Sequence, residues 1–142
     1  MASSWIFWAL LSAVFAGLTA VLAKAGVAGV NSHLATAIRT SVVLVFAWAI
    51  AGLTVRPLAL GELSRRTWLF LALSGLATGL SWLCYFRALQ LGPASQVAPV
   101  DKLSVLLVAV FAVLFLHERP SVREWTGILM VGAGVLVLAL KR

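Results

Sequence analysis

The chain has 142 residues, a formal net charge of +7 and a mean hydropathy of +1.08, with 63% hydrophobic and 11% charged residues. A water-soluble domain needs roughly 25% charged residues to cover its surface, so this composition excludes a soluble globular protein. The basic residues are scattered and form no long run, so they do not indicate nucleic-acid binding.

Five apolar stretches predict an all-α integral membrane protein with five transmembrane helices. Each residue adds about 1.5 Å to a helix, so about 20 residues cross a hydrocarbon core roughly 30 Å thick. In chain order the stretches cover residues 5–23, 32–53, 67–89, 94–116 and 125–140. We expect one membrane domain over residues 1–142, located in the bacterial inner membrane as a multi-pass protein, with the lipid bilayer as its surroundings.

The connections between the stretches are short and rich in turn-forming residues, such as Gly29, Asn31 and Pro93. Short connections in a membrane make sequential helices antiparallel neighbours, which predicts a compact five-helix bundle. The basic residues on the two sides of such a bundle are nearly balanced. The side of the N-terminus carries Arg56, Arg65, Arg66, Arg119 and Arg123, and the other side carries Lys24, Arg87, Lys141 and Arg142. This count favours a cytoplasmic N-terminus but leaves insertion in both orientations open.

Small residues recur at spacings that allow helices to approach closely in lipid. Gly75 and Gly79 form a GxxxG pattern in the third stretch, and Gly132 and Gly134 lie in the fifth. Such residues let backbones meet where lipid offers no hydrophobic drive for association. We expect packing within the fold first, and a contact between subunits second.

Charged residues inside the apolar stretches are the main candidates for function. A charge at the bilayer centre costs about 2.5–3.5 kcal/mol on insertion scales, so it persists where it faces a bundle interior or a wet cavity. The candidate pathway residues are Arg39, Asp101 and Lys102, with Lys24 as a weaker candidate. Three structural alternatives stay open: interfacial anchoring by Lys24 and Arg87, an Arg39–Asp101 salt bridge, and a purely structural Asp101–Lys102 pair.

Asp101 and Lys102 follow Pro99 in the fourth stretch. Neighbouring residues lie about 100° apart around a helix, so these two side chains should face different walls. Pro99 removes a helical hydrogen bond and is the expected hinge or a simple kink. Asp101 is the one acid clearly within a stretch, which makes it the candidate for proton coupling, although nearby cations would stabilise its ionised form.

Aromatic residues near the end of the third stretch, Trp82, Tyr85 and Phe86, offer flat apolar walls for a substrate, or serve packing alone. The excess of cations over acids inside the stretches would attract an anionic or carboxylate-bearing solute if Lys24, Arg39, Arg87 and Lys102 shared one pocket. The pattern suggests no catalytic constellation, metal cluster or cofactor.

The run from Tyr85 to Asp101, Tyr-Phe-Arg-Ala-Leu-Gln-Leu-Gly-Pro-Ala-Ser-Gln-Val-Ala-Pro-Val-Asp, together with Leu-His-Glu-Arg at 116–119, resembles an EamA domain of the drug/metabolite transporter superfamily. The resemblance covers nearly the whole chain, including Lys24 and Arg39. It implies a carrier of small molecules such as amino acids, nucleotides or sugar-related compounds.

Most members of that family resemble two such units fused with opposite orientation, whereas this chain has one. The resemblance therefore implies a homodimer, expected to be antiparallel, that works by alternating access around a midplane site. We expect a secondary transporter of small metabolites or drugs. The alternative is a non-transporting accessory or structural membrane subunit.

Overall fold

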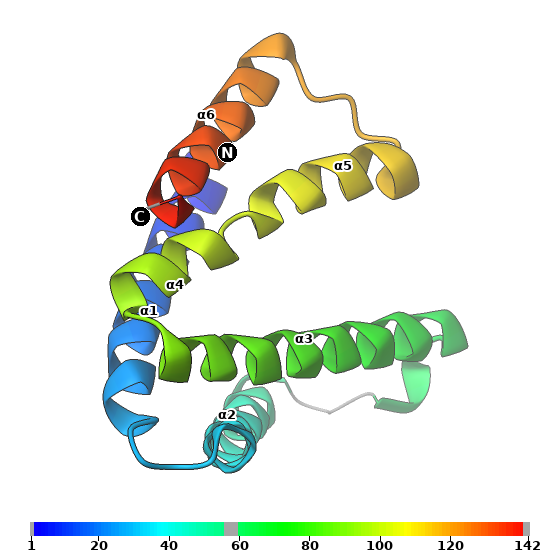
Figure 1. Cartoon of the computed structure of the whole chain (residues 1–142). Helices are drawn as coiled ribbons and strands as arrows, with labels where there is room; N and C mark the ends of the chain where they lie inside the picture. Colours follow the sequence, from blue (N-terminus) through cyan, green and yellow to red (C-terminus); the bar gives the residue numbers. More distant parts are fainter. Residues whose placement is uncertain (1, 56–59, 141–142) are drawn as a thin grey trace. The chain divides into compact units, whose positions relative to one another are not determined.

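The computed structural model describes residues 2–55 and 60–140, and these residues form helices joined by short connections (Figure 1). The elements are α1 (Ala2–Gly26), α2 (Ser32–Thr54), the 3₁₀ turn η1 (Leu60–Glu62), α3 (Arg65–Leu91), α4 (Ala94–Asp101), α5 (Ser104–Leu116) and α6 (Val122–Ala139). The predicted all-α class is confirmed.

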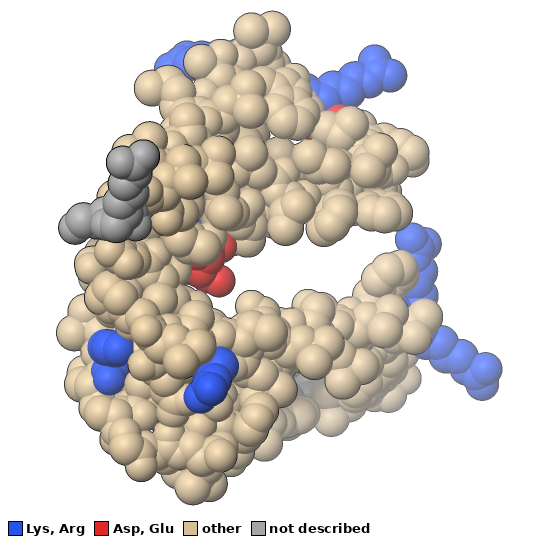
Figure 2. Space-filling model, in the orientation of Figure 1, with Lys and Arg blue, Asp and Glu red and all other residues tan. Residues whose placement is uncertain are grey.

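Among the residues that the structure describes, five helical segments are long and apolar enough to cross a membrane, and the fourth of them consists of α4 and α5 together. Large apolar side chains such as Phe46, Phe70 and Phe115 are exposed along these helices, as lipid-facing side chains are. Figure 2 shows the same property on one face, where charged side chains, mostly Lys and Arg, occur at a few separate points on a surface that other residues make up. The chain is a multi-pass membrane protein.

The helices extend past the apolar stretches that predicted them. α1 continues to Gly26, α3 begins at Arg65 and α6 begins at Val122. Hydropathy marks only the part of a helix that lies in lipid, whereas the helix ends where its terminal backbone groups find partners.

A capping box sets the start of α6. The Ser121 hydroxyl accepts a hydrogen bond from the Glu124 backbone N–H at 3.3 Å, and the Glu124 carboxylate accepts one from the Ser121 backbone N–H at 2.6 Å. Two otherwise unpaired N–H groups are thereby satisfied, which fixes the first turn three residues before the predicted apolar stretch begins.

The structure divides into two compact units, Leu22–Leu91 and Met1–Val21 with Gly92–Arg142. α1 contributes its last residues to the first of these units and the rest to the second. The expectation of a single membrane domain stays a prediction. Arg56, Lys141 and Arg142, which enter the charge count, lie outside the described residues.

In the unit that contains α4, α5 and α6, the last helix packs against both of the others. Gly132 of α6 is buried, and a methyl group built on it would lie 2.8 Å from Cδ1 of Leu106 on α5. Gly75, Gly79 and Gly134 have no such neighbour within 4 Å. Of the four predicted packing glycines, Gly132 therefore makes the close helix contact for which the absence of a side chain is required.

Replacing Gly132 by valine should destabilise the α5–α6 contact by about 1–3 kcal/mol, because the added methyl groups meet Leu106 in an already filled space. Unfolding of the purified chain in detergent, followed by tryptophan fluorescence, measures the effect. Gly134→Val is the matched control, since the same change in the same helix meets open space. Adding Leu106→Ala should recover part of the loss. Equal destabilisation by both valine variants would show that the effect belongs to the helix rather than to this contact.

Candidate functional site

The fourth membrane span is interrupted between α4 and α5, at Lys102 and Leu103 (Figure 1). Tight turns bridge the interruption: the N–H of Lys102 donates to the Pro99 carbonyl at 2.9 Å, and that of Leu103 to the Val100 carbonyl at 3.0 Å. Two further bonds of the same spacing lead into α5. Tight turns in the middle of a helix often mark a hinge or local strain.

The interruption follows the proline rather than coinciding with it. α4 continues through Pro99 to Asp101. A proline lacks the N–H that would bond to the preceding turn, and its effect on the ladder of hydrogen bonds is expected within that turn. Here the first tight-turn bond is made by the N–H of Lys102, the residue directly after the end of α4. Pro99 takes part in the irregular backbone because its carbonyl accepts that bond.

Asp101 and Lys102 pair with each other, with 3.4 Å between Nζ and Oδ2. Their side chains are 38% and 55% exposed, respectively. The long flexible stem of a lysine allows its ammonium group to reach the carboxylate of a neighbouring residue. That the two side chains face different walls stays a prediction. An Arg39–Asp101 salt bridge would join the two units and stays a prediction.

In the other unit, the polar face of α2 lies toward α3. Ser32, Thr36, Arg39 and Thr40 recur at helical spacing, and Ser32 and Thr36 are buried. The hydroxyls of Thr36 and Thr40 donate at 2.8 Å to the carbonyls of Ser32 and Thr36. These local bonds satisfy the hydroxyls, so the face can be buried within a membrane protein at little cost.

Arg39 rests on two of the predicted aromatic residues of α3. Its guanidinium carbon lies 4.3 Å from the centre of the Trp82 ring and 5.5 Å from that of Phe86. Phe86 is buried, while Trp82 and Tyr85 are half-buried. Such stacking holds the cation by its flat face, and the N–H groups of a guanidinium lie in the plane of the group, where they can meet an anion.

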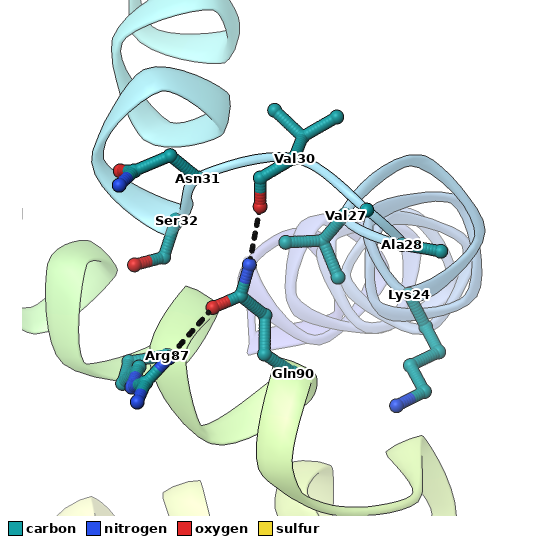
Figure 3. A pocket seen from close by; sticks show the side chains of 9 residues that line it. Lys24, Val27, Ala28, Val30, Asn31, Ser32, Arg87 and Gln90 are labelled. Carbon is teal, nitrogen blue, oxygen red and sulfur yellow. Dashed lines mark hydrogen bonds between the residues drawn. The ribbon is translucent and has the colours of Figure 1, made fainter.

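Lys24 and Arg87 line a pocket of about 460 Å³ at the ends of α1 and α3 (Figure 3). The rest of its lining is Gln90 and the segment of residues 27–32, which joins α1 to α2. The Lys24 ammonium donates to the Leu89 carbonyl, and the Gln90 amide nitrogen donates to the Val30 carbonyl. Arg87 donates from Nη1 to Gln90 Oε1 at 3.2 Å.

The structure thus gathers the predicted residues into three places: Arg39 with Trp82 and Phe86, Lys24 with Arg87, and Asp101 with Lys102. Within the unit Leu22–Leu91, Arg39 is not part of the lining around Lys24 and Arg87. A single pocket for all four cations, which would also require Lys102 of the other unit, stays a prediction. Sequence reasoning missed Gln90 and the polar face of α2. The recurrence of Ser32, Thr36 and Thr40 at helical spacing was the available signal for that face.

The stacking of Arg39 on Trp82 should contribute about 0.5–2 kcal/mol to the stability of the unit. A double-mutant cycle of Arg39→Gln and Trp82→Leu measures this coupling through unfolding in detergent. Trp68→Leu is the control, because Trp68 lies on the same helix and is exposed. Additive effects of Arg39→Gln and Trp82→Leu would contradict the contact.

Comparison with known proteins gives a family and several named relatives. A transporter from Sinorhizobium sp., named as an uncharacterized transporter in the cobO 3' region, is 58% identical over 140 residues, which is 99% of both chains. The transporter YxxF of Bacillus subtilis (strain 168) is 25% identical over 98% of this chain, and the match covers 43% of YxxF. No solved structure matches the chain.

A third relative matches only half of the chain. The probable 4-amino-4-deoxy-L-arabinose-phosphoundecaprenol flippase subunit ArnE of Yersinia pestis (strain Pestoides F) is 32% identical over 70 residues, which is 49% of this chain and 61% of ArnE. The family match is far more extensive, since it covers residues 3–140. The chain belongs to the EamA-like transporter family and is a membrane transporter.

Proposed function

We propose that the chain is a secondary transporter that carries a small metabolite across the bacterial inner membrane, and that two copies form the working unit. The observation that carries this proposal is the interruption of the fourth span beside Asp101 and Lys102. Irregular backbone at membrane depth is tolerated where it is buried in protein or lines a water-filled cavity, and broken helices form the central sites of many transporters.

The geometry of Asp101 and Lys102 favours a pathway over structural support. A pair that stabilises a bundle should connect two helices, whereas this pair joins adjacent residues of one chain segment. It brings opposite charges close together at little entropic cost, and leaves both side chains partly exposed. A charged solute or a proton can therefore compete for either member of the pair.

Arg39 is the second proposed pathway residue, together with the Trp82–Phe86 wall. The aromatic rings orient the guanidinium, and α2 supplies hydroxyl groups on the same polar face. A preformed cation beside flat apolar rings suits a solute with both a carboxylate or phosphate and an apolar body.

The comparison with relatives supports the homodimer. The match to the YxxF transporter covers less than half of that protein, as one of two repeated units would. The Sinorhizobium relative, by contrast, has nearly the same length as this chain. Two copies in opposite orientations would supply the two halves that alternating access requires.

One observation favours the rival assignment, an accessory subunit that does not transport by itself. ArnE is named as a subunit of a flippase, and its similarity to this chain extends over 70 residues. In that case the charged residues would serve contacts with a different chain. The experiments below distinguish the two assignments.

Asp101→Asn should reduce transport to the level of empty vesicles while membrane insertion persists, because the neutral amide removes the charge at the interruption and keeps its size. Uptake of labelled amino acids, nucleotides and sugar-related compounds into everted vesicles, measured over a series of pH values, provides the readout. Glu118→Gln is the control, since Glu118 is an exposed acid in a connection outside the helices. Unchanged uptake at every pH would remove Asp101 from the coupling role.

Cysteine accessibility along residues 91–106 should reveal a water-reachable stripe at helical spacing that includes the neighbourhood of Lys102. The scan starts from a Cys84→Ala background, because Cys84 is the one cysteine of the chain and is exposed. Labelling with a membrane-impermeant maleimide measures access. Uniform protection of all positions would favour the accessory subunit.

Cysteine pairs introduced in α6 should cross-link two copies, and each terminus should be labelled from both sides of the membrane. Both results together are expected for an antiparallel homodimer whose chains insert in either orientation. Compartment-specific labelling with closed vesicles makes the measurement. One-sided labelling of each terminus would rule out the antiparallel arrangement.

A further inference from the structure

The pocket at the ends of α1 and α3 has a lining unlike that of an apolar packing defect. Two of its side chains, Lys24 and Arg87, are cations, Asn31, Ser32 and Gln90 are polar, and its lining contains no carboxylate (Figure 3). Its volume, about 460 Å³, falls within the range of small-molecule sites, roughly 300–1,000 Å³. From the lining we infer that this pocket binds an anion of the phosphate or carboxylate type.

The charge of the surrounding unit supports an anionic ligand. Between residues 22 and 91 the sequence has one acid, Glu62, against six Lys and Arg residues. Lys24 and Arg87 come from different helices, and in Figure 3 they lie on either side of Gln90. A ligand between them would meet positive charge from two directions.

Hydrogen-bond capacity points the same way. Arg87 is exposed and gives one bond, from Nη1 to Gln90, whereas a guanidinium has five N–H donors. Its fork of donors matches the oxygens of a phosphate or carboxylate. Gln90 donates to the Val30 carbonyl and accepts from Arg87. The bond to Val30 fixes the Gln90 side chain, and Gln90 in turn orients the Arg87 guanidinium.

The beginning of α2 adds to the positive potential. Asn31 and Ser32, its N-cap and first residue, line the pocket, and the Asn31 side chain accepts from the His33 N–H at 2.9 Å. The first turn of a 23-residue helix carries partial positive charge, which favours an anion nearby.

A structural role for the same cations is the competing explanation. Lys24 lies in the last turn of α1, where a cation offsets the partial negative charge of a helix end, and Arg87 lies just before the last turn of α3. This role accounts for the bond from Lys24 to the Leu89 carbonyl. It does not account for a cavity lined by both cations, by polar side chains and by the start of a third helix.

The pocket lies where three helix ends meet, and helix ends of membrane spans lie near the membrane surface. The anion therefore has two sources with the same chemistry, the headgroup of an anionic lipid or a soluble phosphate or carboxylate. The inference concerns equilibrium binding and does not depend on the transport proposal.

The experiment uses the purified full chain and two probes. Isothermal titration with inorganic phosphate in non-ionic detergent tests the soluble source. Native mass spectrometry of chain reconstituted in nanodiscs of phosphatidylcholine, with and without phosphatidylglycerol, tests the lipid source. Saturable phosphate binding would assign the soluble source, and selective retention of phosphatidylglycerol would assign the lipid source.

Ala28→Glu is the decisive variant, because Ala28 is an exposed residue of the pocket lining and its replacement places a negative charge there. Binding of the retained probe should weaken about tenfold or more, since an ionic hydrogen-bonded contact is opposed by a like charge. Ala28→Gln, of equal size and neutral, should bind as the original chain does.

Arg87→Gln should show a similar loss, and Arg87→Lys should keep part of the affinity. Arg65→Gln removes a cation at the other end of the same helix and should have no effect. If Arg87→Gln does not fold, the Ala28 pair decides. Absence of saturable binding to both probes, or equal weakening by Ala28→Glu and Ala28→Gln, would overturn the inference.

Discussion

Within a lipid bilayer, a polar group that finds no partner in the protein has none in the solvent, and this constraint governs the observed contacts. Thr36 and Thr40 satisfy their hydroxyls on carbonyls of their own helix. Lys24 and Gln90 instead use carbonyls that lie more than 50 residues away in the sequence. The bonds within α2 make its polar face compatible with burial. The bonds of Lys24 and Gln90 connect helix ends that are distant in the sequence.

The two units use different contacts because lipid removes most of the hydrophobic drive for helix association. The unit Leu22–Leu91 has a small buried apolar group that includes Val27, Phe86 and Leu89. Hydrogen bonds from Lys24 and Gln90 to backbone carbonyls join its helix ends. In the other unit, close approach between Gly132 and Leu106 accompanies the packing of α6 on α5. Each unit therefore depends on a few short-range contacts rather than on a large core.

Hydropathy predicted the five spans because each apolar stretch is long enough to cross the bilayer. It missed the helix ends, since the capping box at Ser121 is set by hydrogen bonds outside the apolar stretch. The depth and type of Arg39 and of the aromatic residues identified them as candidates, but stacking on Trp82 depends on which helices pack together. The contact of Gln90 with Val30 could not be predicted, because every residue has a backbone carbonyl and the sequence does not indicate which one a side chain will bind.

The positive charge of the unit Leu22–Leu91 restricts which ligands and partners it can bind. Its cations outnumber its single acid, so its charge has to be balanced from outside the unit. A second copy of the chain brings the same excess and cannot neutralise it. Asp101, which lies in the other unit, is already paired with Lys102. An anionic ligand or an acidic partner would balance this charge, and the guanidinium groups of Arg39 and Arg87 are planar donors of the kind that bind carboxylate or phosphate.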